Sequence, residues 1–98
     1  MVRHSDFMVK IIFLHPDDNV ATVLEKVEEG TEIQIEKNPN NIQTVKTITK
    51  IPFLHKIALT DIAEGSPVIK YGQIIGKASQ NIKEGEHVHT RNLKSWFY

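Results

Sequence analysis

The sequence of 98 residues contains no cysteine, so disulfide bonds, thiolate zinc sites and cysteine nucleophiles are excluded. It has no excess charge of either sign, because 12 basic residues balance 12 acidic ones. This balance argues against broad binding to nucleic acids or membranes. No apolar run approaches the roughly 20 residues of a membrane span, and the N-terminus lacks the apolar core of a signal peptide. We therefore expect a soluble, cytoplasmic protein.

Several motifs of common enzymes are also missing. There is no Gly-x-Gly-x-x-Gly motif, no phosphate loop and no nucleophile elbow. The length fits one domain, near the size at which a single hydrophobic core stabilises itself, and 40% of the residues are apolar. The sequence therefore predicts one small domain without a complete active site.

Short strands joined by tight turns are predicted for most of the chain. The nearly continuous apolar run over residues 7–14 indicates a buried strand, which Pro16 would end. Beyond residue 30, Ile33 and Ile35 alternate with polar residues, and residues 42–51 are rich in β-branched side chains. An apolar–x–Glu–Gly pattern occurs three times and is typical of a recurring turn; it ends at Gly30, Gly65 and Gly85.

One short α-helix is predicted near residues 20–28, within a fold that is otherwise mainly β. Asp17 and Asp18 precede it and could cap its first turn. They also look like a general acid/base pair, but their position favours capping. Gly30 follows, where a left-handed cap would end the helix. The apolar residues of the segment are spaced at i, i+3, i+4 and i+7: Val20, Val23, Leu24 and Val27.

Histidines are the strongest candidates for chemistry. His87 and His89 are two residues apart, so on a strand their side chains share one face. They could supply two ligands to a divalent metal, with His55 or His15 completing the set. The alternative is that both are ordinary surface residues on an exposed strand.

Basic residues near these histidines could bind a carboxylate. Arg91 could do so through a bidentate pair of hydrogen bonds. Lys70 lies beside the turn at Tyr71 and Gly72, which would place its side chain reproducibly. Lys77 is more typical of a solvated lysine.

Four stretches, in one order, resemble the N-terminal domain of the altronate and galactarate dehydratases. That domain belongs to the SAF group, which is similar to the small β-clip fold of type III antifreeze proteins. The resemblance covers about residues 8–93, between a segment 1–7 that we expect to be flexible and an aromatic C-terminal segment 94–98. The stretches are His15-Pro16-x-Asp18-Asn19-Val20-Ala21, His55-Lys56-x-Ala58-Leu59-Thr60-Asp61-Ile62, Val68-Ile69-Lys70-Tyr71-Gly72-x-x-Ile75-Gly76 and Gly85-Glu86-His87-Val88-His89.

The resemblance implies part of an enzyme. In this family the domain is fused to a large catalytic domain or is a separate small subunit, as in sulfolactate sulfo-lyase. The reaction eliminates water or sulfite from a hydroxy acid, typically with Fe(II) or Mn(II). This chain would then be the small subunit of a sugar-acid dehydratase, inactive without its large catalytic subunit. The alternative is a stand-alone, non-catalytic SAF module that binds a small carbohydrate acid or a partner protein; formation of a homo-oligomer stays open.

The candidate site residues form two sets. His87, His89 and His55 are the candidates for binding a metal, and Lys70, Arg91 and Asn92 are the candidates for binding the substrate. The sequence departs from the family at one point, because the usual His-x-His-x-His-Asn is His87-Val88-His89-Thr90-Arg91-Asn92 here. An arginine cannot serve as a neutral metal ligand. It could instead bind the carboxylate of the acid.

Overall fold

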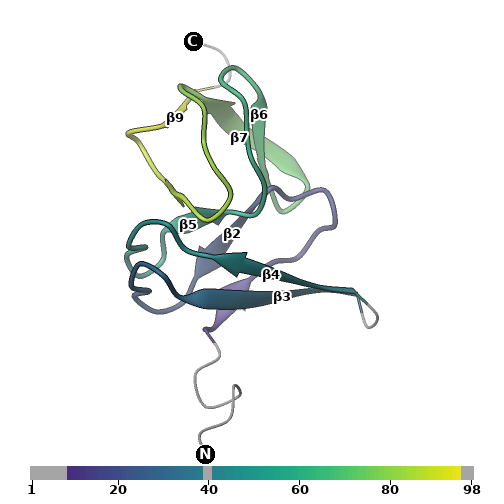
Figure 1. Ribbon diagram of the computed structural model, residues 1–98. Coiled ribbons are helices and arrows are strands. Elements are labelled where there is room, and N and C mark those ends of the chain that lie inside the picture. Colours follow the sequence, from purple (N-terminus) through teal and green to yellow (C-terminus); the bar gives the residue numbers. More distant parts are fainter. Residues whose placement is uncertain (1–8, 39–40, 96–98) are drawn as a thin grey trace, which may run out of the picture.

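Three small antiparallel sheets make up the fold (Figure 1). The computed structural model describes residues 9–38 and 41–95, without the side chains of residues 37 and 38. The first sheet has the strand order β1-β2-β5-β8, the second is the hairpin β3-β4, and the third has the order β6-β7-β9. The strands are β1 (Ile11–Ile12), β2 (Val20–Val23), β3 (Glu32–Asn38), β4 (Asn41–Lys46), β5 (Lys56–Ala58), β6 (Pro67–Lys70), β7 (Gln73–Ala78), β8 (His87–Val88) and β9 (Leu93–Lys94).

The prediction of a mainly β domain is confirmed, but the predicted helix near residues 20–28 is wrong. Val20–Val23 is strand β2, and the part of the chain that the structure describes contains no helix. Val27 makes an isolated bridge to Ile51 instead of continuing a helical stripe. The helical spacing was misleading because β2 is buried on both faces, and a short strand covered on both sides shows no alternation.

Asp18 does not cap a helix. Its side chain is buried, with 6% of its surface exposed, and its Oδ1 accepts a hydrogen bond of 2.7 Å from the amide of Gly72. Asp18 therefore fastens the turn between β6 and β7 to the loop before β2, and this use of its carboxylate argues against a role in acid/base chemistry. The expectations about residues 1–7 and about the aromatic side chains of residues 96–98 fall outside the described residues.

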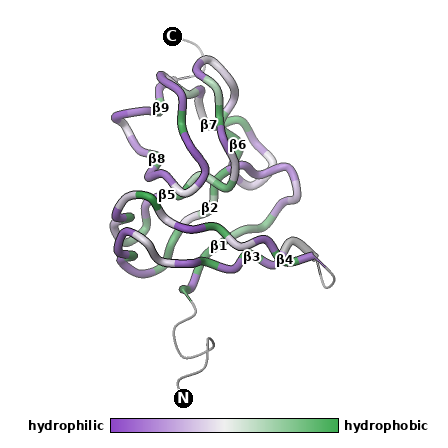
Figure 2. Tube along the Cα trace, viewed as in Figure 1, coloured by the Kyte–Doolittle hydropathy of each residue, from purple (hydrophilic) through white to green (hydrophobic). Residues whose placement is uncertain are grey.

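Two hydrophobic cores lie on opposite sides of the β2–β5 pair. Figure 1 shows β2 and β5 between the β3–β4 hairpin and the sheet of β6, β7 and β9, and in Figure 2 green apolar segments alternate with purple hydrophilic ones along the chain. Ala21 and Ile57 pack into the core shared with the hairpin. Val20 and Ala58 pack into the other core, together with Ile62, Val68, Ala78, Ile82 and Val88.

The recurring Glu–Gly pattern is a recurring turn, as predicted. Each of its glycines has a positive φ, between 84° and 88°. Two of the turns close with the same backbone hydrogen bond, from Ser66 to the carbonyl of Ala63 and from Glu86 to the carbonyl of Lys83, at 2.9 Å each. Gly85 has a second constraint, since a Cβ there would overlap the carbonyl oxygen of Lys46.

We expect Gly85→Ala to destabilise the fold much more than Gly65→Ala. At Gly65 an added Cβ meets nothing within 4 Å, so the cost is that of a left-handed alanine, about 1 kcal/mol. At Gly85 the clash with Lys46 adds about 1–3 kcal/mol of overpacking. Urea unfolding of both variants measures the difference. Equal free energies of unfolding would contradict the close packing of this turn against β4.

Candidate functional site

Three histidines converge where β5 and β8 pair. His55 directly precedes β5, His87 is the first residue of β8, and Ile57 pairs with His87 in an antiparallel register. One ring nitrogen of each of His55, His87 and His89 lies within 4.8 Å of the others. His55 Nδ1 and His87 Nε2 are 2.8 Å apart and share a hydrogen bond. We call His55, His87 and His89 the His triad; within residues 9–38 and 41–95, no other group of three His, Asp or Glu side chains comes close enough to bind a metal.

The rings of the His triad are stacked. The ring centroids of His55 and His89 are 4.0 Å apart, and those of His55 and His87 are 5.0 Å apart, with interplanar angles of 17° in both pairs. All three side chains are half-buried. Stacked rings at this distance would repel each other if they were charged, so the arrangement suits neutral imidazoles.

The surroundings favour the neutral form of two of these rings. Burial lowers the pKa of His55, and the neighbouring charges of His89 and Lys56 lower it further. Burial likewise lowers the pKa of His87, with further contributions from the other two histidines, Arg91 and Lys56. A neutral imidazole keeps a lone pair that can bind a metal ion or accept a hydrogen bond.

Two loops hold the His triad in place. A turn from Pro52 to His55 is closed by a 3.0 Å hydrogen bond between the His55 amide and the Pro52 carbonyl. Within it Leu54 has a φ of 65°, a conformation that costs a residue other than glycine about 1 kcal/mol or more. On the other side, the amide of His87 donates to Thr49 Oγ1 at 3.0 Å.

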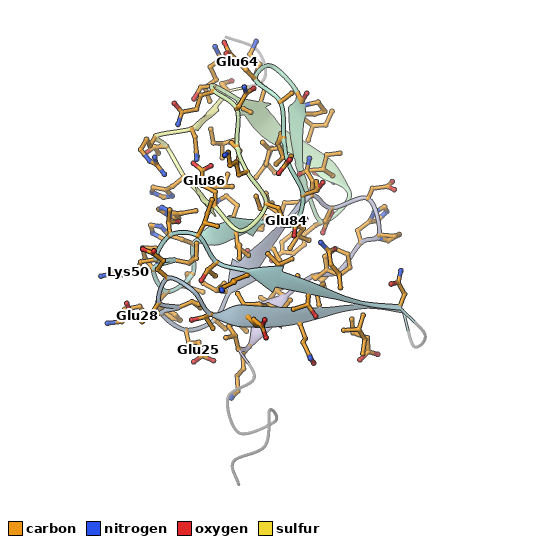
Figure 3. All side chains as sticks on the ribbon, in the orientation of Figure 1. Glu25, Glu28, Lys50, Glu64, Glu84 and Glu86 are labelled. Atoms are coloured by element: carbon orange, nitrogen blue, oxygen red, sulfur yellow. The ribbon has the colours of Figure 1, made fainter. Side chains whose placement is uncertain are left out.

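The structure separates the residues expected to bind substrate. The guanidinium of Arg91 is exposed and lies 3.7 Å from a carboxylate oxygen of Glu86, a side chain labelled in Figure 3. Lys70 lies on β6, with its ammonium 4.8 Å from the ring centroid of Tyr71. Asn92 is fully buried, and its amide bonds to His87 and His89. Of the three, Arg91 offers an exposed charged group close to the His triad.

His15 does not belong to the His triad. Its Nδ1 accepts a 3.1 Å hydrogen bond from the amide of Asp17, and its ring lies against Gly72. Of the two histidines considered from the sequence, the fold therefore brings His55 beside His87 and His89.

Sequence reasoning missed Lys56, which follows His55. Its side chain is half-buried, and its pKa is lowered by burial first and then by the charge of Lys70. No acidic group among the described residues forms an ion pair with it. Lys56 therefore adds positive charge next to the His triad. Its place beside His55 was the available signal.

The fold and the His triad define a small β domain with a candidate site for a metal ion or a carboxylic acid. Residues 9–96 match the altronate/galactarate dehydratase SAF domain family. The chain belongs to this family. It is 42% identical over 87 residues to the altronate dehydratase of Escherichia coli, and 35% identical over 88 residues to that of Bacillus subtilis.

The alignments cover most of this chain but only a small part of each altronate dehydratase. The aligned parts are 89% and 90% of this chain but 17% of each altronate dehydratase. The chain is also 51% identical over 45 residues to the (2R)-sulfolactate sulfo-lyase subunit alpha of Chromohalobacter salexigens, covering 46% of this chain and 48% of that subunit. These relatives are larger catalytic proteins or subunits of enzymes. No helix in the described part of the chain is long and apolar enough to cross a membrane.

We expect the protein to lose stability as the pH falls below about 6.5, the ordinary pKa of histidine. Because the pKa values of His55 and His87 are lowered in the folded state, the unfolded chain takes up protons first. The free energy of unfolding should therefore fall between pH 6.5 and the lowered values. Urea unfolding of chelator-treated protein from pH 7.5 to 5.5 measures this slope. His87→Asn should flatten it; a slope equal to that of the wild type would contradict the assignment.

Proposed function

We propose that this chain is the SAF subunit of a sugar-acid dehydratase of the altronate/galactarate type, which works with a separate large catalytic subunit. The main observation behind this proposal is the His triad, in which three ring nitrogens lie within 4.8 Å of one another. The family membership supports the reaction class. The coverage of 17% of the altronate dehydratases supports a large catalytic partner.

The His triad fits a divalent metal in its chemistry. Three imidazoles without a thiolate suit Fe(II) or Mn(II) as well as zinc. Two nitrogen ligands of a tetrahedral ion lie about 3.3 Å apart, between the 2.8 Å of the His55–His87 contact and the 4.8 Å limit of the group. The stacked rings would need to rotate about their side-chain bonds so that the three lone pairs converge.

Arg91 is the proposed substrate contact. Its guanidinium is exposed and lies near the His triad, where it contributes to the lowered pKa of His87. A carboxylate of the acid could accept two hydrogen bonds from it. Arginine in place of the family's third histidine would thus exchange a metal ligand for a carboxylate ligand. Lys56 adds positive charge that favours an anionic substrate.

The remaining chemistry is assigned to the large subunit. When bound, a divalent ion would polarise the carboxylate and hydroxyl groups of the acid. Elimination also needs a base for the proton next to the carboxylate. Glu86 is a poor candidate, because its carboxylate already accepts hydrogen bonds from the Lys83 amide at 2.9 Å and from Asn92 at 3.3 Å. This chain would therefore bind and orient the acid but not remove the proton.

Exposed apolar residues beside the His triad form the proposed contact with the large subunit. Phe53 and Leu54 are 57% and 53% exposed and directly precede His55, and Ile48 is 44% exposed next to Thr49, which bonds to His87. We call Ile48, Phe53 and Leu54 the Leu54 patch. Its removal from water on docking would be favourable. A partner seated there would also close the site over the His triad.

The metal prediction is tested on the chain itself. Wild-type protein should bind Mn²⁺ or Fe²⁺ weakly, with an affinity that falls as the pH drops below about 6.5 through the lowered pKa values of His55 and His87. His87→Ala/His89→Ala should lose measurable binding in calorimetric titration. The matched control is His15→Ala, which removes a histidine outside the His triad and should bind like the wild type. A double variant with unchanged affinity would show that these rings are only surface residues.

The function and the contact surface are tested in a chimera. This chain would replace the segment of Escherichia coli altronate dehydratase that it matches. We expect the chimera to dehydrate altronate and the isolated chain to show no turnover of altronate or galactarate. Phe53→Ser/Leu54→Asn in the chimera should lower kcat/KM by about tenfold, the loss of a central interface contact.

The control for the chimera is Ile74→Ser, which changes an exposed isoleucine on β7 and should leave kcat/KM unchanged. Asparagine is chosen at Leu54 because it tolerates the left-handed conformation. Turnover by the isolated chain would contradict the assignment of catalysis to the large subunit. An inactive chimera that binds metal through the His triad would favour the stand-alone binding module.

A further inference from the structure

Asn92 bridges the two halves of the loop that carries His87 and His89. Its Oδ1 accepts a 2.9 Å hydrogen bond from the His89 amide, and its Nδ2 donates a 2.8 Å hydrogen bond to the His87 carbonyl. Nδ2 also lies 3.3 Å from a carboxylate oxygen of Glu86. The side chain is fully buried, so water does not compete for these hydrogen bonds.

The loop needs such a bridge because β8 is short and lies at the edge of its sheet. β8 has two residues, and His89 lies beyond its end. On an edge strand the amides that face away from the neighbouring strand have no backbone partner. Here side chains replace that partner: Thr49 Oγ1 accepts from the His87 amide and Asn92 Oδ1 accepts from the His89 amide.

We propose that Asn92 is a positioning residue for the His triad: by fixing the backbone of His87 and His89, its amide sets the spacing of their rings and hence the affinity for a divalent metal. The inference rests on the proposed metal-binding role of the His triad. A metal site tolerates errors of only about 0.5 Å in ligand placement, and without the bridge the His89 backbone would keep only the bonds that its carbonyl accepts from Asn92 and Leu93.

The chain contains a matched second bridge. Asn19 Oδ1 accepts a 2.7 Å hydrogen bond from the Ile69 amide, and Asn19 Nδ2 donates a 2.9 Å hydrogen bond to the Pro67 carbonyl. Like Asn92, it joins the amide of one residue to the carbonyl two positions earlier. This bridge fastens β6 to the start of β2 and involves no residue of the His triad. Asn19 therefore separates the loss of a buried amide bridge from an effect on the metal site.

The test compares Asn92→Ala with Asn19→Ala in the full chain. Co²⁺ is the probe, because its visible absorption reports the number and geometry of the nitrogen ligands. Asn92→Ala should weaken Co²⁺ binding by about tenfold or more, as loss of an outer-shell partner does, and should change the absorption spectrum of the bound ion. Asn19→Ala should bind Co²⁺ within about twofold of the wild type, with the same spectrum, even if its Tm falls as far.

A second variant covers the case in which Asn92→Ala does not fold. Asn92→Asp keeps an oxygen acceptor for the His89 amide but loses the donor to His87, and it should bind Co²⁺ with intermediate affinity. A folded Asn92 variant with wild-type affinity and spectrum would overturn the inference and leave the metal site standing. Equal losses in Asn92→Ala and Asn19→Ala would also overturn it. A wild-type chain that binds no Co²⁺ would overturn the metal site itself.

Discussion

Burial of β2 on both faces is the constraint on which the rest of the structure depends. All four residues of Val20–Val23 are buried, so a short strand must be paired on both edges and covered on both sides. β1 and β5 pair with its two edges, and the two hydrophobic cores cover its two faces. Because β5 is held by β2, it presents its other edge to β8. That pairing brings His55 beside His87, although 32 residues separate them.

The His triad combines this geometry with an uneven distribution of charge. The protein as a whole has no net charge, but Lys56 and Arg91 lie close enough to His87 to add to the lowering of its pKa that burial chiefly causes. Such local positive charge disfavours a second proton on the rings and attracts anions. Lys56 and Arg91 thus also favour a negatively charged ligand. The imidazole lone pairs suit a divalent metal, whereas the positive charge of Lys56 and Arg91 suits an anion such as a hydroxy acid and works against the cation.

Much of the candidate site could be read from the sequence, because His87 and His89 are only two residues apart and their rings stay together although His89 lies just beyond the end of β8. The choice between His55 and His15 needed the fold, since it depends on which strand pairs with β8. The helix prediction failed for the same reason: local spacing cannot report that β2 is covered on both faces. From the sequence, Asn92 was a candidate for binding the substrate. Its burial, visible only in three dimensions, assigns its amide to the backbone instead.

Leu54 and Tyr71 are the residues other than glycine with a positive φ in the described part of the chain, and both are large and exposed. Tyr71 lies in a hairpin turn where asparagine would be more favourable, and its ring receives the ammonium of Lys70. Leu54 belongs to neither core. An apolar side chain held in a strained turn and exposed to water gains little for the isolated domain. Backbone strain of this kind gathers at sites of function, and Leu54 directly precedes His55. The strained, exposed Leu54 is therefore consistent with the proposal that a partner covers this side chain and the His triad.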